Sequence, residues 1–235
     1  MRNLEVIDLG LIDYRRAWYF QREVFKGVKA GITPSTLIFC QHNPVITLGS
    51  RGKREHIRVG LAELELRGIE IYEIERGGDV TYHGPGQIVA YPIFNLCHLK
   101  KDVHWFLRKL EEIVIDFLAD FDIRAVRRLG LPGVWINDQK IASIGVAIKN
   151  WITFHGISIN IKKSILKNFD LIKPCGLEIE VTSLENVLGR IISIKEAQKC
   201  LLEQFQKTFL PHSKVVCNEK MEFCIGPPKE GEKND

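Results

Sequence analysis

Apolar residues recur at helical spacing in several segments of the chain. After Asp13, which suits a helix N-cap, this spacing predicts an amphipathic helix that ends near Gly31. A second helix follows Asp102 and carries the strongest apolar stripe. A third begins at residues 193–196, where serine and glutamate have the spacing of a capping box. A short helix is expected over residues 59–67.

Short apolar runs bounded by turn residues predict strands between these helices. The predicted strands are residues 36–41, 45–48, 69–75, 88–94, 123–128, 133–136, 140–148 and 153–161. Strands and helices are mixed without strict βαβ alternation. The pattern therefore predicts an α+β fold, with a mixed, mainly antiparallel sheet packed with helices. We expect one domain over residues 1–225 and a disordered polar tail over residues 226–235.

Composition and charge exclude several classes of protein. A net charge of +4 over 235 residues is small for a nucleic-acid-binding face, although it suits an acidic protein partner. No run is apolar enough to span a membrane, and the N-terminus lacks a signal-peptide core, so we expect a cytoplasmic protein without a membrane partner.

The six cysteines include no C-x-x-C pair, which argues against a zinc ribbon or a thioredoxin-type redox motif. The Cys97-His98 pair, Cys217 and Cys224 are too scattered for a metal site, and we predict none. Cys40, Cys97 and Cys200 fall in predicted strands or helices and are expected in the core. The chain is also long enough to fold without a disulfide framework.

Residues 76–87, RGGDVTYHGPGQ, are predicted to form a tight loop between two strands. Glycine lets the backbone approach a ligand closely and leaves its N–H groups accessible. The segment matches neither a Walker A loop nor a dinucleotide-binding fingerprint. Its mixture of glycine with arginine, aspartate, threonine and histidine favours a functional loop over a structural hairpin turn.

Two further positions carry reactive side chains. Lys140 follows the predicted turn Asn137-Asp138, and taken alone it suits a solvated lysine at a strand end. Cys175 lies between Pro174 and Gly176 in a predicted loop, and taken alone it suits a small buried apolar residue. Neither residue by itself indicates catalysis.

Together, these segments resemble the lipoyl(octanoyl) transferase family. The matching motifs are RGGDVTYHGPGQ at 76–87, K-I-A-x-x-G at 140–145, F-H-G-x-x-x-N at 154–160, P-C-G at 174–176 and T-S at 182–183. Earlier pieces also match: Tyr14, Ala17, Gln21, His42-Asn43-Pro44 and Thr47-Leu48-Gly49. The resemblance covers about residues 14–185. It departs at Lys173, where asparagine is expected, and at residues 157–158, where a more apolar pair is expected.

The resemblance implies the fold of biotin and lipoate ligase catalytic domains and an acyltransferase that needs no ATP or other cofactor. The donor would be octanoyl-acyl carrier protein. The acceptors would be lysines of lipoyl domains in 2-oxoacid dehydrogenases and in the glycine cleavage H protein. Cys175 would form the thioester, with Lys140 as its partner. A lysine can favour the thiolate by its charge or take the proton as a general base, and the sequence leaves both roles open.

The resemblance also implies a substrate pocket with an apolar slot between sheet and helix for the acyl tail. Its predicted lining is Arg76, Gly77, Gly78, Asp79, Val80, Thr81, Tyr82, His83, Ser143, Ile144, Gly145, Gly156, Ile157 and Ser158. Backbone N–H groups near residues 77–78 or 175–176 are candidates for an oxyanion site.

Two other functions fit parts of the sequence. An ATP-dependent lipoate or octanoate ligase on the same fold would need Lys140 but would leave Cys175 idle. A non-enzymatic module that binds carrier or lipoyl domains would explain the mild positive charge. It would give no purpose to the glycine-rich loop or to the pairing of Lys140 with Cys175.

Overall fold

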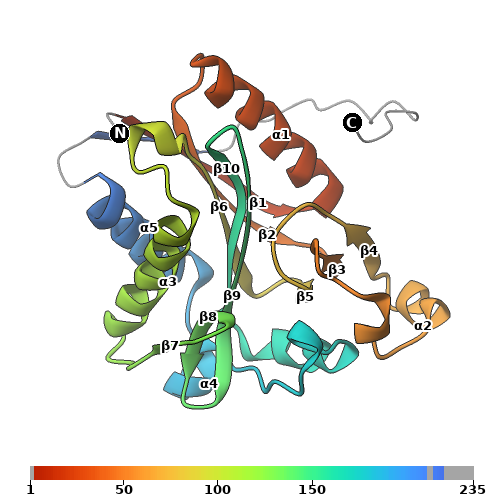
Figure 1. Ribbon diagram of the computed structural model, residues 1–235. Helices are drawn as coiled ribbons and strands as arrows, with labels where there is room; N and C mark the ends of the chain where they lie inside the picture. Colours follow the sequence, from red (N-terminus) through yellow and green to blue (C-terminus); the bar gives the residue numbers. More distant parts are fainter. Residues whose placement is uncertain (1–2, 211–213, 220–235) are drawn as a thin grey trace, which may run out of the picture.

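The computed structural model describes residues 3–210 and 214–219, in which a large mixed sheet forms the centre (Figure 1). Its strands are β1 (Asn3–Ile12), β2 (Ser35–His42), β6 (Gln87–Ile93), β7 (Val126–Arg128), β8 (Leu131–Ile136), β9 (Gln139–Lys149), β10 (Ile152–Asn160) and β11 (Lys214–Glu219). They lie in the order β11-β1-β2-β6-β10-β9-β8-β7. Strand β1 is parallel to β11 and β2, and the other neighbours are antiparallel. The predicted α+β class with a mainly antiparallel sheet is confirmed.

A second, three-stranded sheet lies beside the first. It consists of β3 (Val45–Leu48), β4 (Glu70–Glu73) and β5 (Val80–His83), with β3 in the middle. Strand β5 lies inside the segment 76–87, which the sequence predicted to be a loop throughout. That prediction is wrong for residues 80–83, because they pair with β3 from Val45↔His83 to Leu48↔Val80.

Three of the helices cover the two faces of the large sheet. The helices are α1 (Tyr14–Ala30), α2 (Leu61–Leu66), α3 (Val103–Ala119), α4 (Leu184–Leu188) and α5 (Ile194–Phe209). The short 3₁₀ turns are η1 (Arg54–His56), η2 (Leu96–His98), η3 (Lys163–Leu171) and η4 (Pro174–Gly176). Helix α1 packs on one face, and α3 and α5 pack on the other (Figure 1). Across residues 3–210 and 214–219, no helix is both long and apolar enough to span a bilayer.

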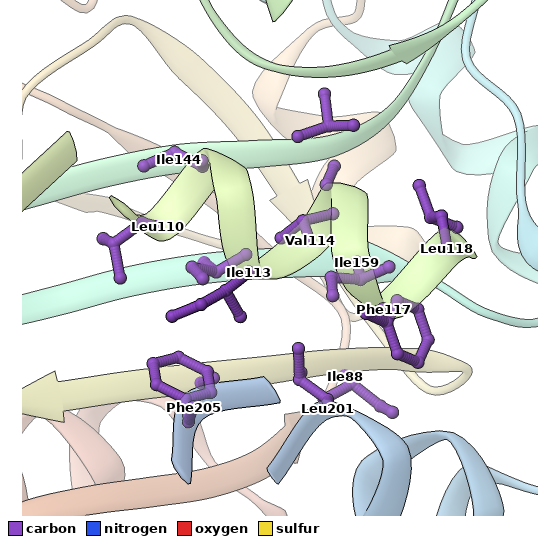
Figure 2. Close-up of a cluster of buried hydrophobic side chains, with 14 of the residues drawn as sticks. Ile88, Leu110, Ile113, Val114, Phe117, Leu118, Ile144, Ile159, Leu201 and Phe205 are labelled. Carbon is purple, nitrogen blue, oxygen red and sulfur yellow. The ribbon is translucent and has the colours of Figure 1, made fainter. Parts of the chain in front are cut away.

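Strand β6 shows why two cores form. Successive side chains of a strand point to opposite faces. Ile88 and Ala90 therefore join the core under α3 and α5, while Val89 and Tyr91 join the core under α1. Figure 2 shows the first of these cores, where the apolar stripe of α3 meets the sheet and α5. The labelled side chains are Ile88, Leu110, Ile113, Val114, Phe117, Leu118, Ile144, Ile159, Leu201 and Phe205.

The ends of the helices agree with the sequence in part. Asp13 caps α1 through a hydrogen bond from the Arg16 N–H, and Gly31 ends the helix in the left-handed conformation with φ 72°. Ser193 is the N-cap residue of α5, but its side chain makes no capping hydrogen bond. The start of this helix is therefore as predicted, while the expected capping box does not form.

The predictions for the cysteines and for the chain ends have different outcomes. Cys40 is buried and Cys200 is half-buried, but Cys97 lies exposed in η2, so its expected place in the core is wrong. The predicted disordered tail over residues 226–235 and Cys224 lie outside the described residues. A single catalytic domain over residues 1–225 stays a prediction.

Candidate active site

A cavity of about 410 Å³ opens where the strands β9, β10 and β6 meet the glycine-rich segment and the start of α3. Most of the predicted pocket residues line it, together with Lys140 and Pro174. The predicted residues on its wall are Arg76, Gly77, Gly78, Asp79, Val80, Thr81, His83, Ser143, Ile144, Gly145, Gly156, Ile157 and Ser158. The structure thus brings the separate sequence motifs to one cavity.

Tyr82 differs from its neighbours. Side chains alternate along β5, so Thr81 and His83 face the cavity while Tyr82 points away from it. The Tyr82 ring packs 5.9 Å from that of Phe169, and its hydroxyl accepts a hydrogen bond of 2.9 Å from the Asn168 amide. Tyr82 is therefore placed to support the second sheet rather than to touch a ligand in this cavity.

Two glycines allow close backbone contacts in this part of the sheet, one between the segment 76–78 and β9 and the other between β10 and β6. The Gly77 N–H donates a 2.9 Å hydrogen bond to the Val146 carbonyl. A Cβ atom at Gly145 would lie 2.7 Å from the Gly77 oxygen, and one at Gly156 would lie 2.2 Å from the Ala90 oxygen. Because both positions are this close to neighbouring backbone, only glycine fits there. The two glycines are paired across β9 and β10.

Arg76 fixes the glycine-rich segment from within. Its side chain is buried, and the guanidinium donates to the backbone carbonyls of Thr47 at 2.8 Å and Asp79 at 2.7 Å. These hydrogen bonds join the second sheet to the segment that lies on β9. A buried arginine stays charged, so it also places a fixed positive charge in the cavity wall.

Lys140 is buried rather than solvated, which excludes the simplest interpretation of its sequence position. Its side chain is only 5% exposed, and its Nζ lies 5.5 Å from the centre of the Trp135 ring. A β-bulge at Ile141 of β9 and the positive φ of Gly133 (129°) make room for it, since a Cβ atom at Gly133 would lie 2.6 Å from Lys140 Cε. The backbone of residues 180–182 pairs with Lys140 through two hydrogen bonds of 2.8 and 3.0 Å.

Cys175 lies in the turn η4, beside the cavity wall formed by Pro174. The turn is held to η1 by a 2.7 Å hydrogen bond from the Lys173 N–H to the His56 carbonyl. A β-bridge between Ile57 and Ile172 adds to this attachment. The backbone therefore brings the P-C-G motif to the same cavity as Lys140, as the resemblance implied.

Aromatic and histidine side chains form a buried polar wall, of which the predicted pocket lining included only His83. His83 lies between Gln87, at 2.7 Å from Nδ1, and Thr47, at 3.4 Å from Nε2. His42 Nε2 lies 2.7 Å from the hydroxyl of Tyr91, which lines the cavity. Burial lowers the pKa of His83 to about 3, with His42 adding to the shift, and burial lowers that of His42 to about 4. Both imidazoles are therefore neutral at pH 7.

These depressed pKa values predict acid instability. An unfolded histidine binds a proton below about pH 6.5, whereas folded His42 binds one only near its lowered pKa. The unfolded chain then binds more protons, so the free energy of unfolding falls as the pH drops. For His42 alone we expect a loss on the order of 2 kcal/mol between pH 7 and pH 5.

Urea denaturation at pH 7 and pH 5 measures this loss. The pH-dependent difference should shrink in His42→Gln and stay as in wild type in His104→Gln, since His104 is exposed. An equal pH-dependent loss in wild type and His42→Gln would contradict the assignment.

Some lining residues had weaker sequence signals. Tyr91, Arg51 and Pro132 lie outside every motif noted in the sequence. Val103 and Leu107 line the cavity from the first turns of α3. Their sequence signal was their place in the apolar stripe of this helix. In the structure Val103 remains partly exposed. The described residues contain no cluster of three or more His, Cys, Asp or Glu side chains that could hold a metal ion.

The family of the chain follows from comparison with known proteins. Residues 13–206 match the family model of the lipoyl protein ligase A/B catalytic domain. The chain belongs to this family. The match spans the glycine-rich segment, Lys140 and Cys175, so the resemblance stated from the sequence motifs is confirmed.

Relatives and solved structures agree with this assignment. The octanoyltransferase of Thermoanaerobacter sp. (strain X514) is 44% identical over 223 residues, which cover 94% of this chain and 96% of that protein. The octanoyltransferase of Cytophaga hutchinsonii is 41% identical over 231 residues, covering 90% and 94%. A crystal structure of lipoate-protein ligase A bound with ATP superposes with a TM-score of 0.77 at 16% identity, covering 94% of this chain and 90% of that one. At that identity the structure supports the fold alone.

Proposed function

We propose that this protein is an octanoyltransferase that moves an octanoyl group from acyl carrier protein to a lysine of a lipoyl domain. The names of relatives at 41% and 44% identity support the acyl transfer itself. The observation that carries the proposal is that Lys140, the turn with Cys175 and the glycine-rich segment meet at one cavity. Protein lipoylation is the process in which such a transfer takes part.

The first step exchanges one thioester for another. The Cys175 sulfur attacks the octanoyl carbonyl, the bond from that carbon to the carrier sulfur breaks, and the thiol proton passes to the departing carrier thiol. Lys140 lines the cavity and is assigned to hold or attract this proton. In the second step the acceptor amine attacks, the bond to the Cys175 sulfur breaks, and the proton of the amine returns to Cys175.

Tetrahedral intermediates in both steps place negative charge on the carbonyl oxygen. The backbone N–H group of Gly78 stays a candidate for binding this oxygen. The N–H groups of Gly77 and Gly176 are less suited, because they already donate to the carbonyls of Val146 and Lys173, each at 2.9 Å.

The acyl tail is assigned to the apolar part of the cavity wall. Val89, Ile144 and Ile157 come from the sheet, and Val103 and Leu107 come from α3. Each buried methylene contributes about 0.8 kcal/mol, so shortening the chain by two carbons is expected to weaken binding roughly tenfold. The proposed preference for eight carbons is therefore real but incomplete.

The donor and the acceptors are proposed from the family resemblance. Octanoyl-acyl carrier protein supplies the acyl group already activated as a thioester, which removes the need for ATP. Lipoyl domains of 2-oxoacid dehydrogenases and the glycine cleavage H protein supply the lysine. A cytoplasmic location stays a prediction from the sequence.

An ATP-dependent ligase is the second candidate, because the fold is shared with a ligase structure that binds ATP. The test is to incubate the purified protein and a lipoyl domain either with octanoyl-carrier protein alone or with free octanoate and ATP. Intact mass of the lipoyl domain measures acylation. We expect one octanoyl group on the domain from the carrier without ATP. Acylation only from octanoate with ATP would replace the transferase proposal by the ligase.

A further inference from the structure

A histidine–aspartate pair lies directly behind the turn that carries Cys175. His56 ends η1, and its Nδ1 atom lies 2.6 Å from Asp79 Oδ2. The two side chains are 17% and 11% exposed, so the contact is largely shielded from water. The second carboxylate oxygen of Asp79 accepts from the N–H of Val80 at 2.7 Å and of Lys53 at 3.3 Å. These bonds fix the carboxylate. Because His56 Nδ1 makes no hydrogen bond of good geometry, Asp79 acts on the imidazole through its charge at this short distance.

The opposite edge of the imidazole faces the turn η4. A Cβ atom at Gly176 would lie 2.8 Å from both Cε1 and Nε2 of His56. Gly176 has a positive φ of 67° and directly follows Cys175. The backbone of His56 also accepts the 2.7 Å hydrogen bond from the Lys173 N–H. The imidazole is therefore packed against the peptide next to the proposed nucleophile.

We propose that His56, paired with Asp79, is a second basic group for the Cys175 thiol beside Lys140. This inference rests on the proposed function and deepens it. A carboxylate at Nδ1 keeps the proton on that nitrogen, so the free lone pair of the neutral ring lies on Nε2, the edge that faces η4. The thiol proton passes to Nε2 as the sulfur attacks the octanoyl carbonyl. It is then given to the carrier sulfur as the thioester bond breaks.

Two carboxylates flank the imidazole. Glu55 Oε1 lies 3.9 Å from Nε2, and Asp79 lies at the other nitrogen. Lys173 and Arg58, which lie near η1, share the carboxylate of Glu178, so one of their two positive charges is offset. Lys140 reaches the cavity from strand β9, so the two basic groups come from separate elements, and Lys140 keeps the role proposed for it above.

The proposal is tested by the pH dependence of the first step. Purified wild type, His56→Gln and Asp79→Asn are mixed with octanoyl-carrier protein without ATP, and the octanoyl adduct is followed by intact mass in a single turnover from pH 6 to pH 9. We expect His56→Gln to be about tenfold or more slower at pH 6.5 and to approach wild type near pH 9. At high pH a thiol with an ordinary pKa of about 8.5 ionises without help. His98→Gln, at an exposed histidine of η2, is the matched control.

A second measurement separates this inference from the proposed function. Alkylation of Cys175 by iodoacetamide, read by peptide mass over the same pH range, reports the thiolate without any acyl donor. The inference predicts that its acid limb moves to higher pH in His56→Gln and, to a smaller extent, in Asp79→Asn. If His56→Gln does not unfold cooperatively, it is not properly folded, and the alkylation profile of Asp79→Asn then tests the inference.

Two results would overturn the inference. One is an alkylation profile in both variants that equals that of wild type. The other is a rate lowered by the same factor at every pH, since this would assign the pair only to holding the turn. If wild type takes up no octanoyl group from the carrier, the proposed function fails, while the alkylation profile still tests His56.

Discussion

Replacing Cys175 by alanine is expected to abolish the covalent octanoyl adduct and to lower octanoyl transfer by about 10⁴-fold or more. The reason is that the proposed route divides the reaction into two thioester steps, both of which form or break a bond to this sulfur. Direct attack by the acceptor lysine on the carrier thioester would be all that remains. The measurement is intact mass of the protein after mixing with octanoyl-carrier protein, followed by the rate of transfer to a lipoyl domain.

The chain offers a matched control for this experiment. Cys97 is exposed in η2 and lines none of the cavity, so Cys97→Ala should keep both the adduct and the rate. A Cys175→Ala protein that still gains one octanoyl mass would place the thioester on another cysteine. A variant without an adduct that transfers at the wild-type rate would remove the covalent intermediate from the mechanism.

Replacing Lys140 by glutamine is expected to slow the transfer by about 10²- to 10⁴-fold, the usual size of a general acid–base contribution. Lys140 is buried in the wall of the cavity, and its Nζ lies near the face of Trp135. Glutamine is of similar length but carries neither the charge nor a titratable amine. The single-turnover rate of adduct formation and the multiple-turnover rate of transfer are measured separately. The rate that falls more, relative to wild type, identifies the step that needs Lys140.

A second substitution separates the two roles that the sequence left open. Arginine keeps the positive charge but cannot give up its proton, so Lys140→Arg should restore much of the rate only if Lys140 acts by charge. Lys149→Gln, on the exposed end of the same strand, is the control and should be close to wild type. Wild-type rates in Lys140→Gln would contradict any role in the chemistry.

The sequence by itself determined the class of fold and most of the secondary structure. Periodic apolar positions located α1, α3 and α5, because a helix that covers a sheet must present one apolar stripe to it. The turn residues Asn137 and Asp138 indicated the hairpin of β8 and β9, because they mark where the chain reverses. The motifs around Lys140 and Cys175 also indicated the family, because each motif combines glycine or proline with a reactive side chain at a fixed spacing.

Other elements were not predicted from the sequence, because they form only through pairing with segments far along the chain. Residues 80–83 lie between glycine-rich stretches, which led to the prediction of a loop, yet they form β5 because β3 supplies their hydrogen bonds. Strand β1 carries polar residues along its length and was not predicted. It forms because β2 and β11 lie on both sides of it. Propensity cannot detect such pairing, since the stabilising hydrogen bonds are not local.

The tertiary structure alone decided how the candidate residues are placed. Lys140 is buried because a bulge between β8 and β9 and a glycine on β8 make room for it. Tyr82 faces away from the cavity because side chains alternate along β5. His56 lies far from Cys175 in the sequence and in no motif noted there, and only the packing of η1 against η4 brings the two together. Sequence patterns record which residues are available for chemistry. Distance and burial, which set their pKa values and partners, depend on how distant segments pack.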